Sequence, residues 1–351
     1  MLTKHFLFWY TVLSDRVAEA CEACDQGSSC GDSLLYYGGV MPKPFLCYED
    51  QIKKLVNEKG LVISDTKYAI DMLKQIGYFG LISGYKLPFK NLTTKKYKDG
   101  TRLEDIVALY KFDENLRELF LKYILQVERH VRSLLSYYFT EKYGEQQGHY
   151  MDLANYTKEP RLQQDVNRLI STLTKLATSN TDYPYINHQR SSYGNVPLWV
   201  LMNGVTFGTL SKFYSLVTPD LKAKVSKNFL GVNEKQLEQF LSVMTKFRNV
   251  CAHNERLFTY RTMNDIPDTL LHSKLGITRK GTTYVNGKND LFSVVIALRY
   301  LLPNESFRKF KASLVRIIRH YLKNTTALTQ EDVLSRMGFP PNWSRITRYS
   351  R

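Results

Sequence analysis

The chain has 351 residues, 43% of them apolar, enough to bury a sizeable core in one large domain or two modest ones without disulfide support. The 49 Lys and Arg residues exceed the 33 Asp and Glu residues, and the net charge of +16 makes a polyanionic partner, nucleic acid or a membrane surface, the first hypothesis. Five cysteines are an odd number for a disulfide framework, which favours a reducing compartment.

Residues 1–40 begin with a short apolar run that resembles a secretory signal. The run from Phe6 to Leu13 is near the lower length limit, and Asp15, Arg16 and Glu19 interrupt the region where cleavage would occur. The stretch DQGSSCGDS that follows is typical of a flexible linker. No later apolar run reaches the roughly 18 to 20 residues of a membrane span. We therefore expect a cytoplasmic protein without membrane contact, with residues 1–40 as an extension and Met41 as an alternative start.

Four of the five cysteines lie before residue 48, and Cys21 and Cys24 form one C-x-x-C pair. No second pair and no histidine cluster at zinc-finger spacing follows them. We therefore expect neither a metal site nor a cofactor.

Residues 41–100 are predicted to form a small helical module followed by a basic loop. The first apolar stripe stops at Gly60, and Ser64 or Asp65 can cap a second helix that ends before Gly77. The next segment, YKLPFKNLTTKKYKDGTR, is rich in lysine and aromatic residues and lacks periodicity, which indicates an exposed loop. Its candidate RNA-binding residues are Lys90, Lys95, Lys96 and Lys98.

A long helix is predicted after the basic loop. Thr101 and Glu104 have the spacing of a capping box, and Asp113 can begin a longer helix with apolar residues at intervals of three and four. Within that helix Glu128 and Arg132 are four residues apart, so they are neighbours on one face. A solvated ion pair and a functional role are both open for them.

The rest of residues 101–325 is also predicted to be helical. Gly204 and Gly208 weaken a helix and therefore mark a bend or a close helix crossing. The only hairpin signal is the weak TTYVNGK, so an all-α bundle is the economical prediction. Helices are expected at 165–177, after Pro197, after Asn233 with Gln236, and from 290 to 323 with a break at Pro303.

The last segment, residues 326–351, is predicted to be a basic tail. Its stretch NWSRITRYSR combines arginines with a Trp and a Tyr, a composition suited to stacking on bases and neutralising phosphates. Arg345 and Arg348 therefore join the lysines as candidate RNA-binding residues.

The stretch TKFRNVCAHNERLF holds Arg248, Asn249 and His253 at the end of a helical pattern. Asn249 and His253 are four residues apart and share a face, whereas Arg248 and His253 are five apart, about 140° around an ideal helix. One regular helix therefore cannot point Arg248 and His253 at a single atom. They can converge if His253 lies at or beyond a distorted helix end, or if two copies of the segment face each other in a dimer.

Such a cleft would be competent to cleave RNA without a metal. A histidine can take a proton from a ribose 2′-hydroxyl or give one to the leaving 5′-oxygen, and an arginine can hold the phosphate. Asn249 would orient the histidine or the substrate. The expected product is a 2′,3′-cyclic phosphate, and DNA should be inert because it lacks the 2′-hydroxyl.

A purely structural interpretation stands beside the catalytic one. Arginine and histidine near a helix C-terminus gain about 0.3–1 kcal/mol from the helix dipole. Glu255 could pair with either side chain. Spacing by itself does not decide between a helix end and a reaction centre.

The string RNVCAH resembles the R-x(4–6)-H signature of the HEPN (higher eukaryotes and prokaryotes nucleotide-binding) superfamily of helical ribonucleases. Its surroundings look like the bacterial abortive-infection (Abi-like) family from Met41 to the low 320s. The segments that carry this resemblance are, in order, KPFLCYEDQIKKLVNEKGLVI, IGYFGLISGYKLPF, VERHVRSLLSYYFTEKYG, PLWVLMNGVTFGTLSKFY and FRNVCAHNERLF.

The resemblance implies a HEPN-like helical bundle in which Arg248 and His253 are the catalytic pair and Asn249 is the polar residue after the arginine. It also implies a homodimer and phage defence by RNA cleavage, with Glu128 and Arg132 as supporting candidates. Glu255, also a supporting candidate, stands where HEPN toxins controlled by adenylylation have a tyrosine. Control by a different antitoxin is therefore expected, for which RNA is one candidate.

Three functions follow from these observations. The leading hypothesis is a metal-independent endoribonuclease of the abortive-infection type. The second is a non-catalytic RNA-binding or RNA-sensing module that uses the lysine-rich loop and the tail. The third is a structural helical scaffold without RNA affinity.

Overall fold

The structure is a computed structural model that describes residues 44–325 and 327–349. The signal-like run, the linker, Cys21, Cys24 and the alternative start at Met41 lie outside the described residues. The chain divides into two compact units, Met1–Cys47 and Tyr48–Arg351, and the description below concerns the second.

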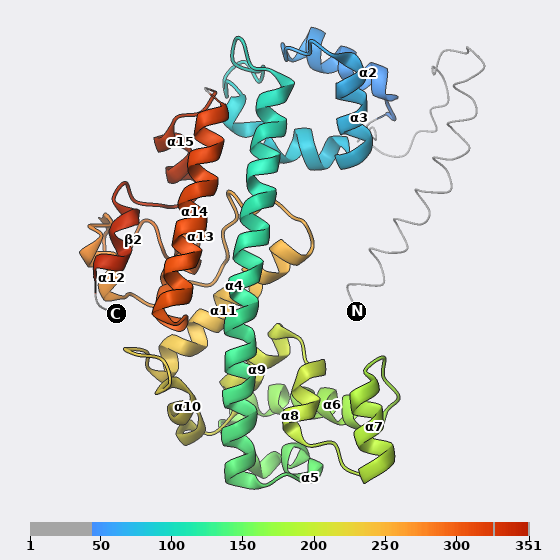
Figure 1. Cartoon of the computed structure of the whole chain (residues 1–351), viewed down its shortest axis with the longest axis vertical. Helices are drawn as coiled ribbons and strands as arrows, with labels where there is room; N and C mark the ends of the chain where they lie inside the picture. The colour runs from blue at the N-terminus through green and yellow to red at the C-terminus, as the bar shows by residue number, and fades with distance from the viewer. Residues whose placement is uncertain (1–43, 326, 350–351) are drawn as a thin grey trace, which may run out of the picture. The chain divides into compact units, whose positions relative to one another are not determined.

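A single helix of 41 residues, α4 (Leu103–Tyr143), runs through this unit (Figure 1). Its apolar residues recur at intervals of three and four and are buried from Leu103 to Phe139, which explains why it is helical over about 60 Å. Asp113 was predicted to begin a helix here, and that prediction is wrong, because Asp113 lies buried inside α4.

The start of α4 also differs by one residue from the predicted capping box. The N-cap residue is Arg102, whose backbone N–H donates to the Asp105 carboxylate at 2.9 Å. Thr101 instead donates its hydroxyl to the carbonyl of Lys98. The predicted pair of Thr101 and Glu104 is therefore replaced by the pair one position further along.

The small N-terminal module has the predicted helical organisation. Asp65 caps α3, since its carboxylate accepts the N–H of Tyr68 at 2.9 Å, and Gly77 ends α3 with a φ of 81° that favours glycine. The module consists of α2 (Tyr48–Lys53), the π-helical turn η1 (Lys54–Glu58), α3 (Thr66–Ile76), the π-helical turn η2 (Phe79–Ser83) and the 3₁₀ turn η3 (Leu87–Phe89).

The middle of the chain forms short helices around the C-terminal half of α4 (Figure 1). Gly204 ends one of the turns, and a Cβ there would lie 3.0 Å from side-chain atoms of Ile186 and Tyr183, which agrees with the predicted close crossing. The elements are α5 (Gln147–Met151), η4 (Leu153–Asn155), η5 (Pro160–Leu162), α6 (Gln163–Thr178), α7 (Pro184–Tyr193), α8 (Leu198–Leu201), η6 (Met202–Gly204), α9 (Phe207–Leu216) and α10 (Pro219–Ser226).

The C-terminal part packs along α4 through α14. Pro303 separates α13 from α14 as predicted, while Trp343 of the predicted tail is 5% exposed and packs edge-on against Phe339. Trp343 is therefore part of the core and not free to stack on bases. The elements are α11 (Glu234–Ala252), α12 (Leu270–Lys274), β1 (Arg279–Lys280), β2 (Thr283–Tyr284), α13 (Leu291–Leu301), α14 (Asn304–Asn324), α15 (Gln330–Arg336) and η7 (Trp343–Arg348).

The predicted all-α class is confirmed. Within the described ranges the only sheet is the antiparallel pair β1–β2, in which Arg279 pairs with Tyr284 and Lys280 with Thr283. Across residues 44–325 and 327–349, no helix combines the length and the apolar character that crossing a membrane requires.

Candidate functional site

The helix α11 carries the Arg248, Asn249 and His253 motif at its C-terminal end and packs against α4. A capping box fixes its start, because Asn233 and Gln236 each accept the backbone N–H of the other, at 2.8 and 3.0 Å. Sequence reasoning predicted this cap. The apolar side of α11 is buried, so its register relative to α4 is set by packing.

The end of α11 is a regular one. The N–H of His253 donates to the carbonyl of Asn249 at 2.9 Å, and Asn254 follows in the left-handed region at a φ of 57°. The N–H of Glu255 then donates to the carbonyl of Val250 at 3.0 Å, which closes the helix in a Schellman motif. His253 is therefore the C-cap of α11, one residue beyond the last helical residue, Ala252, with a φ of −93° and a ψ of 9°.

The three motif side chains differ in exposure. Asn249 and His253 are exposed to solvent, whereas the Arg248 side chain is 30% exposed and lies against α4. Glu255 was expected to be able to pair with Arg248 or His253. Between these described residues no such ion pair forms; instead the Glu255 side chain borders a pocket that is described below.

Glu128 of α4 is the acidic residue that lies next to Arg248. Its carboxylate is 6% exposed and bonds Arg132 at 2.6 Å with one oxygen, while the other oxygen lies 3.9 Å from Nε of Arg248. Arg132 also donates to the carbonyl of Val205 at 3.1 Å. The ion pair of Glu128 and Arg132 therefore exists, but it is mostly buried and points at the motif.

Some polar atoms of Glu128, Arg132 and Arg248 form no hydrogen bond within the described part of the chain. Oε2 of Glu128 and Nε of both Arg132 and Arg248 are buried atoms without a hydrogen-bond partner among the described residues. Burial raises the pKa of Glu128, and the charges of Arg132 and Arg248 oppose that rise. An ion pair of 3.9 Å is too long for a hydrogen bond, so Arg248 keeps donors for another ligand.

A second buried acid, Asp113, holds the loop that follows the motif. Its carboxylate accepts the backbone N–H groups of Leu257 and Phe258 at 2.9 and 2.6 Å. It also accepts the hydroxyl of Tyr85 at 2.6 Å and pairs with Arg117 at 3.0 Å. Asp113 therefore ties α4, the N-terminal module and the motif loop together.

Sequence reasoning missed the function of Asp113, although a signal was present. Asp113 and Arg117 are four residues apart on the same helix, the spacing that drew attention to Glu128 and Arg132. Burial raises the pKa of Asp113, and the Tyr85 hydrogen bond and the Arg117 charge oppose that rise.

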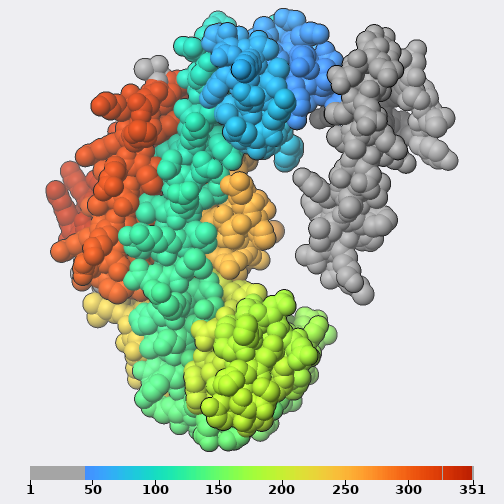
Figure 2. All heavy atoms as spheres, turned by 45° about the vertical axis from the view of Figure 1, so that its right-hand side comes forward, coloured from blue at the N-terminus to red at the C-terminus, as the bar shows by residue number. Residues whose placement is uncertain are grey.

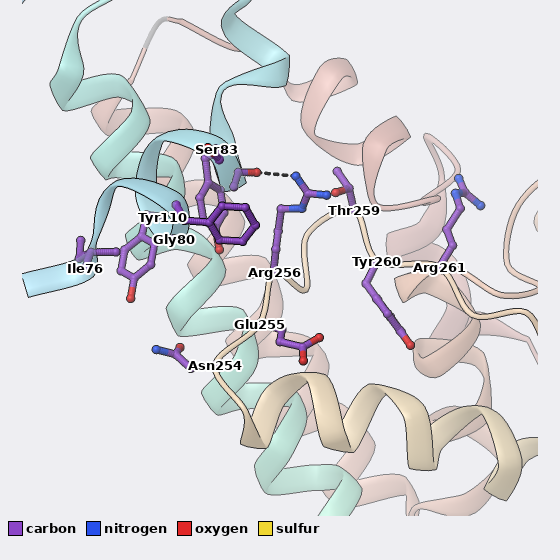
Figure 3. A pocket seen from close by; sticks show the side chains of 13 residues that line it. Ile76, Gly80, Ser83, Tyr110, Asn254, Glu255, Arg256, Thr259, Tyr260 and Arg261 are labelled. Carbon is purple, nitrogen blue, oxygen red and sulfur yellow. Dashed lines mark hydrogen bonds between the residues drawn. The ribbon is translucent and has the colours of Figure 1, made fainter. Parts of the chain in front are cut away.

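A pocket of about 720 Å³ opens directly after the motif (Figure 3). One wall comes from the end of α3, from η2 and from Tyr110 of α4, and the other from the loop that begins at Asn254. Arg256 bridges the two walls by donating to the carbonyl of Gly84. In Figure 2 this loop, drawn in orange, lies on a hollowed face between the N-terminal module and the α6–α7 region.

The candidate RNA-binding residues fall into two surface regions. Lys95, Lys96 and Lys98 are exposed, whereas Lys90 is half-buried with its ammonium 5.5 Å from the centre of the Tyr97 ring. Burial and the charges of Lys86 and Lys59 lower the pKa of Lys90. Arg345 and Arg348 are exposed on η7.

In the described part of the chain, no three His, Cys, Asp or Glu residues gather in a group that could hold a metal ion.

A family model described as Abi-like protein matches residues 71–259, slightly more than half of the chain. That segment spans α4, α11 and the whole motif. No curated protein and no solved structure matches the sequence.

Proposed function

Because the chain belongs to the Abi-like protein family, which suggests abortive infection of phage-infected cells, we propose that it is a metal-independent endoribonuclease. The observation that carries this proposal is the end of α11. There, Asn249 and His253 are exposed at the helix end, and Nε of Arg248 lies 3.9 Å from the buried carboxylate of Glu128.

The proposed reaction uses the substrate's own 2′-hydroxyl as the nucleophile. His253 takes the proton of that hydroxyl, the 2′-oxygen forms a bond to phosphorus, and the bond from phosphorus to the 5′-oxygen breaks. A second proton donor protonates the leaving 5′-oxygen, and Arg248 offsets the charge that develops on the phosphate. The products are a 2′,3′-cyclic phosphate and a 5′-hydroxyl.

Glu128 has a positioning role in this proposal. Its buried carboxylate lies between Arg132 and Arg248 and restricts where the Arg248 guanidinium can point. Arg132 satisfies the other carboxylate oxygen, so the Arg248 side stays open for a phosphate. Removal of Glu128 would therefore weaken phosphate binding without removing the histidine.

A homodimer completes the proposed cleft. On an ideal helix the spacing would place Arg248 and His253 about 140° apart, and in the structure His253 is the C-cap just beyond the last helical residue, Ala252. A two-fold axis close to the C-terminal end of α11 would bring the arginine of one copy to the histidine of the other.

A non-catalytic RNA-binding module is the second candidate. The exposed Lys95, Lys96 and Lys98 of the basic loop favour it, because they can neutralise phosphates without any reaction. In that case control of the cell would depend on RNA binding, and His253 would have no part in it.

Incubation of purified protein with structured RNA in EDTA tests the proposal. We expect cleavage to fall by at least about 100-fold in His253→Ala, the contribution typical of general acid–base catalysis, and to be similarly low in Arg248→Ala. His188→Ala is the matched control, since His188 is an exposed histidine on α7. Cleavage that is absent in the wild type, or unchanged in both motif variants, would refute the proposed ribonuclease function.

A further inference from the structure

The pocket next to the motif has the position of a substrate subsite. Its lining begins at Asn254, the residue directly after His253, and continues through Glu255 and Arg256. A nucleotide next to a phosphate bound at His253 can therefore reach the pocket mouth. The volume of about 720 Å³ lies within the range of small-molecule sites, so a nucleotide fits inside it.

The pocket offers flat surfaces on which a base can stack. Phe79 is 85% exposed at one edge, and Tyr110 and Tyr260 add rings from the two walls. Gly80 lies beside Phe79 and leaves the wall without a side chain at that position. Aromatic rings beside an open wall are the usual surroundings of an unstacked RNA base.

Two arginines, Arg256 and Arg261, and one carboxylate, that of Glu255, line the pocket. Arg261 is tied to Asp290 at 3.2 Å, whereas Arg256 spends one donor on the carbonyl of Gly84 and has five in all. Arg256 therefore keeps donors for a phosphate at the mouth of the pocket.

The walls are fixed before any ligand arrives. Asp113 holds the loop through Leu257 and Phe258, and it holds the opposite wall through Tyr85. The bond from Arg256 to Gly84 joins the same two walls a second time. A preformed pocket spends little binding energy on ordering its own side chains.

We propose that this pocket binds a nucleobase of the RNA strand next to the cleaved phosphate and thereby selects the cleavage site. Phe79, Tyr110 and Tyr260 provide the stacking surfaces, and Arg256 holds the adjoining phosphate. The Glu255 carboxylate can only accept hydrogen bonds when ionised, so it favours the amino group of adenine over uracil, whose single donor, N3–H, lies between two carbonyl oxygens that repel a carboxylate. The proposal rests on the proposed ribonuclease function.

Binding of RNA to full-length His253→Ala protein tests the pocket without cleavage. The probes are fluorescent oligo(A) and oligo(U) of about 8 nucleotides, within the site sizes of single-strand binders. Gly80→Leu adds a side chain to the pocket wall. It does so without backbone strain because Gly80 has no positive φ, and a Cβ there meets only a side-chain atom of Ile76 at 3.5 Å. We expect oligo(A) affinity to fall about tenfold or more, the size of one lost base stack.

Two controls separate the pocket from general effects. Gly148→Leu adds the same side chain at an exposed glycine of α5 with nothing within 4 Å of its Cβ, and should leave affinity unchanged. Phe79→Ala removes an exposed ring and tests the pocket if Gly80→Leu fails to fold, with Leu230→Ala, at a leucine 71% exposed, as its control. Oligo(A) affinity equal to wild type in Gly80→Leu or Phe79→Ala protein that remains folded overturns the proposal.

The base preference gives an independent readout. We expect oligo(A) to bind more tightly than oligo(U), and Glu255→Gln to reduce the difference, because an amide can also donate to the uracil carbonyls. Equal affinity for both probes in the presence of Glu255 contradicts the assigned role of Glu255. Pocket-dependent binding by a wild-type protein that does not cleave RNA would refute the ribonuclease and leave the base-binding site supported.

Discussion

The carboxylate of Asp113 accepts a hydrogen bond from the backbone N–H of Leu257 at 2.9 Å, although the two residues are 144 positions apart. This contact anchors the loop after the Arg248 and His253 motif to the N-terminal third of α4. Because the same carboxylate also binds Tyr85, the loop, the long helix and the N-terminal module share one buried charge. The geometry next to the candidate site therefore depends on a residue that is fully buried.

Asp113→Ala should be strongly destabilising. The substitution leaves Arg117, whose side chain is 4% exposed, as an uncompensated buried charge, and such a loss costs about 3–5 kcal/mol. Urea unfolding followed by circular dichroism measures the change. Asp71→Ala removes an exposed carboxylate of α3 and should stay within about 0.5 kcal/mol of wild type. A loss below about 1 kcal/mol for Asp113→Ala would show that the cluster is not a structural anchor.

Mixing two inactive variants tests whether the cleft is shared between chains. If Arg248 of one copy acts with His253 of the other, a dimer of Arg248→Ala with His253→Ala chains contains one intact cleft out of two. Random exchange should then restore about a quarter of wild-type cleavage in a symmetric dimer. The measurement is RNA cleavage after co-refolding of the two variants. A mixture as inactive as its components would mean that both residues act from the same chain.

The salt dependence of RNA binding reports on the basic loop. Replacement of Lys95, Lys96 and Lys98 by alanine should flatten the slope of log affinity against log salt by about 2, since each single-strand phosphate contact contributes about 0.7. Fluorescence anisotropy at a series of salt concentrations measures the slope. Alanines at three other exposed lysines, Lys158, Lys227 and Lys235, keep the net charge equal to that of the test variant. An equal change of the slope in both variants would show that the loop is not part of the RNA-binding surface.

Asp290 should make the stability of the protein depend on pH. It is 1% exposed and caps α13, and burial raises its pKa to about 6 from an unfolded value near 3.8. Between about pH 4 and pH 6 the folded state therefore binds more protons at Asp290 than the unfolded state does. The stability that the protonated form contributes is complete below about pH 4 and is lost as the pH rises through about 6. The loss amounts to about 3 kcal/mol.

Asp290→Asn removes this titration and should flatten the free energy of unfolding between about pH 4 and pH 7. Denaturant unfolding at several pH values measures the slope, and Asp182→Asn, at an exposed position, should keep the wild-type slope. Parallel curves for wild type and Asp290→Asn would contradict the raised pKa.

Local signals determined the helical architecture of this protein. Asp65, the pair Asn233 and Gln236, and Pro303 act on residues within one helical turn, so their effect on helix ends could be predicted from the sequence alone. For the motif, the spacing of Arg248 and His253 fixes their angle only on a regular helix, whereas the structure places His253 at the C-cap of α11. The all-α class followed from the same periodicity.

Only the tertiary structure decided where the charges lie. Asp113 and Thr101 have the local signature of helix starts, yet burial against Tyr85 and the motif loop made Asp113 an internal anchor. Trp343 belongs to a segment, NWSRITRYSR, whose composition is typical of a free tail, but its side chain packs into the core. The contact of Asp113 with the motif loop spans 145 residues and that of Arg256 with Gly84 spans 172, which local spacing cannot encode. The pocket beside His253 exists only because such contacts join its two walls.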